Sequence, residues 1–242
     1  MLNLTGKTHR AGGMLCSVVG FAILRENGLL SPDVHEGLQW AVMYPFCMWG
    51  SIVSDLDHHW DSCPSKDYPS YILNKVLHLT APLEKVTERF GKKNIFYRFF
   101  RFLNAHHRSW QTHSDLTLFS MIFLIYCVLS QRFFSLSGFD GTILSLILMG
   151  LSLGIIAHFI LDMLTPEGVW NSVVVILNRV FLKGKIPKRF EKWHFVPRWK
   201  CFATGSKWEC FVQKVLKIAT VIAIIWFLLT LFIPNWMSYL KV

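Results

Sequence analysis

The sequence predicts an all-α, multi-span membrane helical bundle of about five spans, with interfacial amphipathic helices on the cytoplasmic side. Three observations lead to this fold class. Of the 242 residues, 52% are hydrophobic and only 17% are charged, which is too apolar for an ordinary soluble domain. Several windows of about 20 residues are long and apolar enough to cross a bilayer as helices. The segments between them are rich in Lys and Arg, which is typical of cytoplasmic loops.

Five apolar segments are the candidate spans, and in chain order they are Ala11–Leu24, Leu38–Ser54, Leu116–Phe134, Ile143–Leu164 and Ile218–Pro234. The first two are short for a hydrocarbon core of roughly 30 Å, so they also fit tilted, re-entrant or internally packed helices. Small residues four positions apart favour close helix packing in two of the spans. These pairs are Gly13 with Ser17 in the first span and Gly150 with Gly154 in the fourth.

The basic residues predict the orientation of the spans. Asp55–Asp115 contains nine Lys or Arg residues and Thr165–Lys217 contains eleven, whereas Arg25–Gly37 and Gln131–Thr142 contain one each. Because positive residues are retained on the cytoplasmic side, both long connections and the amino terminus are predicted to be cytoplasmic. With five spans, the carboxyl terminus is then outside.

Both long connections contain a basic, aromatic stretch, Arg89–Leu103 in the first and Lys183–Trp208 in the second. Ile95, Phe99 and Phe102 recur at helical spacing among basic residues, which predicts a helix lying on anionic membrane lipid. The same composition can stack the bases of single-stranded nucleic acid. Both stretches adjoin spans, however, so membrane lipid is the favoured partner and there is no strong evidence for nucleic acid.

The predicted topology brings His and Asp residues from four distant segments to the cytoplasmic face. These candidate ligands are His9, Asp55, Asp57, His107, His113, His158 and Asp162. Imidazole and carboxylate are the usual protein ligands of zinc and also suit manganese or iron. We therefore predict a divalent metal centre of one to three ions, with zinc as the first choice. The six cysteines have no metal-ligand spacing and are not included.

Local spacing refines this prediction. His158 and Asp162 stand at i and i+4, so one helix presents both on the same side. Asp55 and Asp57 stand at i and i+2 and converge only at a helix end or a turn. Either of two further histidines, His58 or His106, can replace a neighbour in the ligand set. Taken singly, each of these residues also fits a structural role, such as an interfacial His or a helix-capping Asp.

Four motifs resemble the YdjM-like inner-membrane metal-dependent hydrolases of bacteria. They are Thr8-His9-Arg10 with Gly12 or Gly13, Ser54-Asp55-Leu56-Asp57-His58, His107-Arg108 with Thr112-His113-Ser114, and the segment Gly154–Gly168 (GIIAHFILDMLTPEG). The resemblance covers roughly residues 5 to 170. It departs from the family at Ser54, where the family usually has Pro. The resemblance implies a bacterial inner-membrane location. Distant similarity of the family to zinc-dependent phospholipases C implies hydrolysis of a phosphoester.

The resulting hypothesis is a metal-dependent hydrolase that acts on a phosphoester, such as a lipid headgroup, at the cytoplasmic face. Asp55 is a ligand or the base that orients water, while Arg10 and Arg108 bind the phosphate-bearing substrate, and Arg108 also stabilises developing charge. The alternative is a metal-ion transporter or sensor without hydrolytic activity, and a third possibility is a membrane-anchored interaction protein. We expect a hydrolase-like domain at residues 1–170 and a basic, Trp-rich segment with the final span at residues 171–242. The sequence leaves the oligomeric state open.

Overall fold

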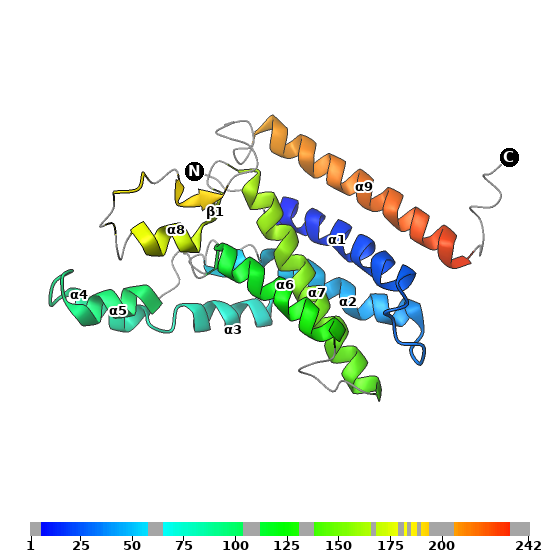
Figure 1. Cartoon of the computed structure of the whole chain (residues 1–242), viewed down its shortest axis with the longest axis horizontal. Helices are drawn as coiled ribbons and strands as arrows, with labels where there is room; N and C mark the ends of the chain where they lie inside the picture. Colours follow the sequence, from blue (N-terminus) through cyan, green and yellow to red (C-terminus); the bar gives the residue numbers. More distant parts are fainter. Residues whose placement is uncertain are drawn as a thin grey trace.

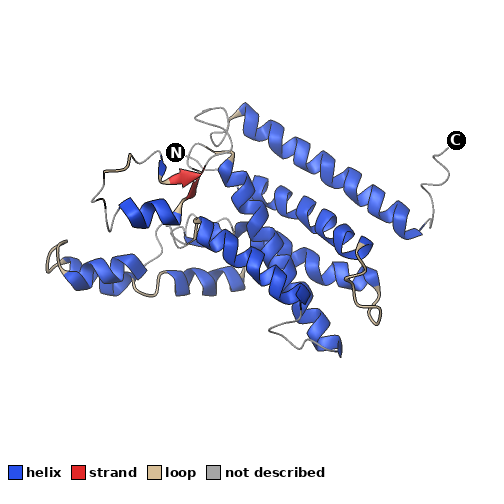
Figure 2. Ribbon diagram, viewed as in Figure 1, coloured by secondary structure: helices blue, strands red, loops and turns tan. Residues whose placement is uncertain are grey.

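Five helices of the described part of the chain form the bundle, and each overlaps one of the five predicted apolar segments. They are α1 (Gly6–Glu26), α2 (Glu36–Val53), α6 (Asp115–Ser130), α7 (Gly138–Met163) and α9 (Lys207–Phe232). The structure, a computed structural model, describes residues 6–57, 65–103, 112–130, 138–165, 168–178, 182, 185–187, 190–193 and 206–232. These residues are nearly all helical, as predicted (Figure 2).

Two helices are long and apolar enough to cross a membrane, over Asp140–Met163 of α7 and Lys207–Thr230 of α9. Of the other three bundle helices, α6 is apolar but has only 16 residues. At 1.5 Å per residue it is about 24 Å long, which is shorter than the hydrocarbon core. α1 has 21 residues but begins with the polar run from Lys7 to Arg10. The structure thus supports two spans among the described residues, and the five-span arrangement remains a prediction.

Small residues let α2 and α7 pack with their backbones in contact. A Cβ atom added at Gly154 would collide with the carbonyl oxygen of Cys47, and one at Gly150 would come within 2.5 Å of the carbonyl oxygen of Met43. Gly13 of α1 likewise faces the Ser51 hydroxyl of α2. The glycine-dependent packing predicted for the first and fourth spans is therefore present, and it joins α1, α2 and α7.

The last helix lies along the first (Figure 1). At one end the Thr8 hydroxyl donates a 2.9 Å hydrogen bond to Glu209, and both residues are buried. At the other end Arg25 donates to the Thr230 hydroxyl at 2.9 Å and pairs with Glu36 at the start of α2. Although separated by most of the sequence, α1 and α9 are thus joined at both ends.

A helical extension, α3 (Tyr68–Leu77), α4 (Ala81–Glu88) and α5 (Ile95–Leu103), projects from the side of the bundle (Figure 1). The predicted amphipathic stretch began at Arg89, but helix α5 starts at Ile95. Gly91 adopts a φ of +97° and the chain turns there, which ends α4 and delays the next helix. Ile95, Phe96 and Phe99 are exposed on α5.

A small β-pair holds the segment that leads into α6. β1 (Val169–Trp170) pairs antiparallel with β2 (Lys192–Trp193), and α8 (Ser172–Ile176) follows β1. The backbone N–H of Trp170 donates to the carbonyl of His113 at 2.8 Å. The buried carboxylate of Asp115 accepts the Ser172 backbone N–H and the Trp193 indole N–H. The pairing joins the end of the predicted hydrolase-like domain, residues 1–170, to the segment that follows it.

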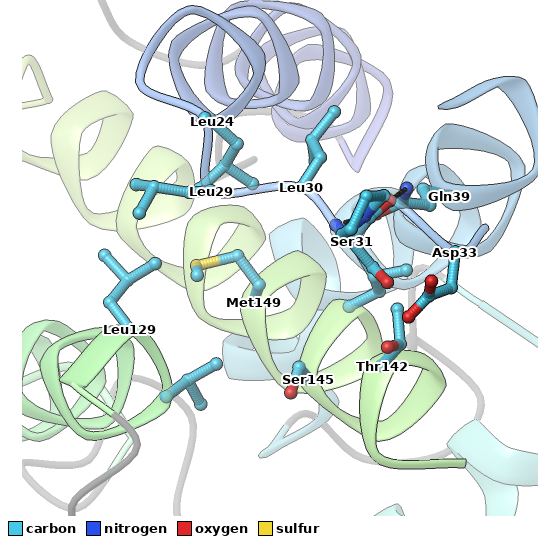
Figure 3. Close-up of a pocket in the computed structure, with 14 residues that line it drawn as sticks. Leu24, Leu29, Leu30, Ser31, Asp33, Gln39, Leu129, Thr142, Ser145 and Met149 are labelled. Atoms are coloured by element: carbon cyan, nitrogen blue, oxygen red, sulfur yellow. Dashed lines mark hydrogen bonds between the residues drawn. The ribbon is translucent and has the colours of Figure 1, made fainter. Parts of the chain in front are cut away.

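A cavity of about 400 Å³ lies between the α1–α2 loop, α6 and α7 (Figure 3). It is lined by Leu24, Leu29, Met149 and other apolar side chains, together with polar groups of the loop. The Gln39 side chain fixes that loop by bonding to both backbone groups of Ser31. This cavity is at the end of α1 far from His9, about 22 Å away along the helix axis, so it is separate from the His and Asp residues.

Candidate metal centre

Helix ends from four segments meet at one end of the bundle and place six acidic or imidazole side chains together. His9 is in the first turn of α1, and His158 and Asp162 are near the end of α7. Asp55 and Asp57 lie on a short 3₁₀ helix, η1 (Ser54–Asp57), that continues from α2. The predicted departure from regular α-helix at this pair is confirmed. The sixth side chain, His113, lies two residues before the start of α6.

All six side chains are buried, none being more than 3% exposed, and their polar atoms face one another. His113 Nε2 and His158 Nε2 are 3.3 Å apart. Asp55 Oδ1 lies 3.6 Å from the first nitrogen and 3.8 Å from the second. Asp162 Oδ2 lies 3.5 Å and 3.4 Å from the same two nitrogens. Two imidazoles and two carboxylates from three chain segments therefore converge.

These separations fit metal ligation better than direct hydrogen bonding. A nitrogen and an oxygen joined by a hydrogen bond are about 2.7 to 3.2 Å apart. Ligand atoms held tetrahedrally at about 2.1 Å from zinc are about 3.4 Å from one another. Asp55 Oδ1 is buried and accepts no hydrogen bond from any described residue. The residues present therefore fit a divalent cation.

His9 completes the cluster from the other side. Its ring stacks on that of His158 with centroids 3.9 Å apart. Its Nε2 lies 3.9 Å from Oδ2 of Asp55 and 3.8 Å from Oδ1 of Asp162. The prediction that His9 and His158 lie at the same end of the bundle is confirmed.

Hydrogen bonds on the outer nitrogens orient two of the imidazoles. His158 Nδ1 lies 2.8 Å from the Ser51 carbonyl oxygen, which can only accept, so Nδ1 carries the proton and Nε2 faces the cluster. His113 Nδ1 lies 3.0 Å from the Thr112 hydroxyl, which donates onward to Asp57. Outer contacts of this type fix which nitrogen can bind a metal. The Thr112 hydroxyl thus connects the imidazole of His113 to the carboxylate of Asp57.

The charges at the site shift two pKa values in opposite directions. Burial alone raises the pKa of Asp55. The imidazoles of His158, His113 and His9 lower it by more than burial raises it, so the net shift is downward. Burial lowers the pKa of His113, and contacts with Asp55 and Asp57 outweigh this and raise it to about 9. A cation bound at Nε2 of His113 must displace a proton that the carboxylates otherwise stabilise.

Of the other predicted site residues, the structure describes only Arg10. His107 and Arg108 lie outside the described residues, as do the substitutes His58 and His106. Arg10 follows His9 on α1 and is partly exposed. Sequence reasoning missed the carbonyl of Ser51 and the buried Glu209 beside Thr8. A backbone carbonyl has no residue signature, and Glu209 had no motif around it.

The site motifs and the long match of the chain agree on a family. The sequence matches the YdjM inner membrane protein family over residues 4–239. The chain belongs to this family. The match extends beyond the roughly 5–170 covered by the motifs, so the YdjM pattern includes the segment after α7 and the final helix. Comparison with the curated proteins and with the solved structures finds no match. The YdjM family name and the two long apolar helices together identify a membrane protein.

Proposed function

We propose that this protein is a metal-dependent hydrolase that cleaves a phosphoester, with a lipid headgroup as the candidate substrate, at the cytoplasmic face of the inner membrane. The buried cluster of imidazole and carboxylate atoms at metal-ligand spacing is the observation that supports it. Burying three carboxylates is costly unless a cation compensates their charge. A divalent cation supplies that compensation, and zinc is the first choice for this mixed nitrogen and oxygen set.

The chemistry that such a cation provides is a lowered pKa for water and polarisation of a phosphoryl oxygen. The chain's own residues would do the rest. The Ser51 carbonyl and the Thr112–Asp57 pair hold two imidazoles in the ligating orientation. Asp55 is proposed as a ligand of the cation, because its buried Oδ1 has no hydrogen-bond donor among the described residues. Arg10 and Arg108 are the proposed phosphate-binding residues.

The proposal of a cytoplasmic site rests on the basic residues near it. The segments that follow α2 and α7 carry most of the Lys and Arg of the chain, and the cluster lies where those segments begin. A positively charged surface next to a metal centre favours an anionic substrate such as a phosphate ester. The membrane setting makes phospholipid headgroups a suitable class to test first.

The test uses the purified full chain in detergent or nanodiscs. Metal content is measured together with hydrolysis of bis(p-nitrophenyl) phosphate and of phosphatidylglycerol vesicles. The variant is Asp162→Asn, which keeps the size of the side chain and removes its charge. Losing an outer contact to a ligand typically lowers metal affinity 10- to 100-fold, so losing a ligand should cost at least about 100-fold and abolish hydrolysis.

The matched control is Asp140→Asn, at the exposed opposite end of the same helix, which should keep both metal and activity. Full metal occupancy in Asp162→Asn, in protein that still inserts into the membrane, would refute the metal site. Metal uptake into proteoliposomes without hydrolysis would instead support a transporter. Against transport, α6 carries a charged residue only in its first turn and α9 carries none from Ile218 to Phe232.

A further inference from the structure

The two carboxylates at the centre of the cluster each divide their oxygens between two groups of histidines. Oδ1 of Asp55 and Oδ2 of Asp162 face the pair His113 and His158. Oδ2 of Asp55 and Oδ1 of Asp162 are instead the oxygens paired with His9. A carboxylate that uses one oxygen on each side is the arrangement of a bridging ligand. A single cation bound through one oxygen of each would leave the His9 contacts unexplained.

We propose that the site binds two divalent cations, bridged by the carboxylates of Asp55 and Asp162. His113 and His158 ligate the first cation and His9 ligates the second. This inference rests on the proposed function only in taking the cluster as a metal centre, and it specifies how many ions the centre holds and which residues hold each.

The buried charge supports two ions over one. Asp55, Asp57 and Asp162 contribute three negative charges, and all are buried. One divalent cation leaves one uncompensated negative charge in the protein interior, which is expensive. Two cations leave one positive charge, and the neutral ligating imidazoles do not change this sum. An anionic substrate can neutralise that remaining charge.

The two positions differ in how many protein atoms surround them. The first is faced by four, namely two imidazole nitrogens and two carboxylate oxygens. Among the described residues, the second is faced by three through these ion-pair distances, His9 Nε2 and the remaining oxygen of each carboxylate. Structural metal sites use four protein ligands, whereas catalytic sites use three and keep one position open. The cation beside His9 is therefore the one that offers a position to water or to a phosphoryl oxygen.

Metal stoichiometry and magnetic coupling test this directly. The chelator-treated full chain in nanodiscs is titrated with Mn²⁺, and bound metal is measured by elemental analysis and by electron paramagnetic resonance. We expect two ions per chain and a spin-coupled signal, because carboxylate bridges couple neighbouring ions. His9→Gln should bind one ion and give an uncoupled signal. The control His78→Gln, outside the cluster, should match the unmodified protein.

Saturation of the unmodified protein at one ion per chain would overturn the inference, and this outcome requires no variant to fold. Two ions without coupling would overturn the bridging role of the carboxylates. Two ions in His9→Gln would overturn the assignment of His9. None of these measurements depends on hydrolysis. Two coupled ions with no phosphoesterase activity would uphold this inference and count against the proposed function, whereas one ion with activity would do the reverse.

Discussion

The carbonyl oxygen of Ser51 determines which nitrogen of His158 faces the carboxylates. It can only accept a hydrogen bond, so it holds the proton on Nδ1 and leaves the Nε2 lone pair directed at the cluster. Thr112 and Asp57 act in the same way on His113. The residue types His9, Asp55, His113, His158 and Asp162 were predictable from their positions at span ends. The orienting contacts were not, because they depend on atoms that meet only in the folded chain.

Asp57 is a predicted metal ligand that nothing in the structure tests as such, and because its carboxylate accepts the Thr112 hydroxyl, we propose that it positions His113. We expect Asp57→Ala to weaken Mn²⁺ binding about 10- to 100-fold without changing the number of ions bound. Asp57→Asn should partly restore affinity, since the amide oxygen can still accept from the Thr112 hydroxyl. A chelator-competition titration measures both.

The loss of a whole ion in Asp57→Ala would show that this carboxylate is itself a ligand. Asp140→Asn serves again as the control for the general effect of removing a carboxylate. A uniform fall in thermal stability, with unchanged affinity in both Asp57 variants, would rule out the positioning role.

Among the helices, the contact between α2 and α7 positions the side chains of the site. Gly154 lies one helical turn before His158, and its closeness to Cys47 brings the Ser51 carbonyl within reach of the imidazole. The small-residue spacing indicated this packing in advance. The β1–β2 pair was not predicted, because two-residue strands show no periodicity. Yet its Trp170 holds the backbone of His113 in place.

Gly154→Ala should separate α2 from α7, because the added methyl group meets backbone rather than a movable side chain. We expect a destabilisation of about 1 to 3 kcal/mol and a weaker metal affinity, as the His158–Ser51 bond lengthens. Thermal unfolding in detergent and Mn²⁺ titration are the measurements.

Gly20→Ala is the matched control for this substitution. Its added methyl group meets only the end of the Leu153 side chain, which can rotate away, so both stability and metal affinity should change little. Equal effects of the two substitutions would show that helix propensity or general crowding, rather than the α2–α7 contact, controls the site.

For the whole molecule, the order of the helices places every contributing segment at the same end. α1 begins there, α2 ends there, α6 begins there, α7 ends there and α9 begins there (Figure 1). This alternation follows from the predicted up-and-down order of five segments, and the shared end was thus predictable. The number of helices that cross the bilayer was not predictable, because their length and polarity leave α1, α2 and α6 near the limit for spanning.

The predicted topology can be tested with two single cysteines in a cysteine-free background. Asp33→Cys, in the exposed α1–α2 loop, should react with a membrane-impermeant maleimide in spheroplasts. Lys92→Cys, exposed between α4 and α5, should react only after lysis, because the basic connection is predicted to be cytoplasmic. Labelling of both from the same side would mean that α1 and α2 do not each cross the membrane.

The spread of the ligands along the chain has a consequence for biosynthesis. The first, His9, and the last, Asp162, are separated by most of the polypeptide, so the cluster cannot exist while the ribosome is still making the earlier helices. Synthesis proceeds at about 5 to 20 residues per second, so α1 is made many seconds before α7. The nascent protein therefore passes through insertion without its centre. Under the proposed orientation, loading follows the synthesis of α7, when the growing or completed chain draws on whatever cation the cytoplasm then supplies.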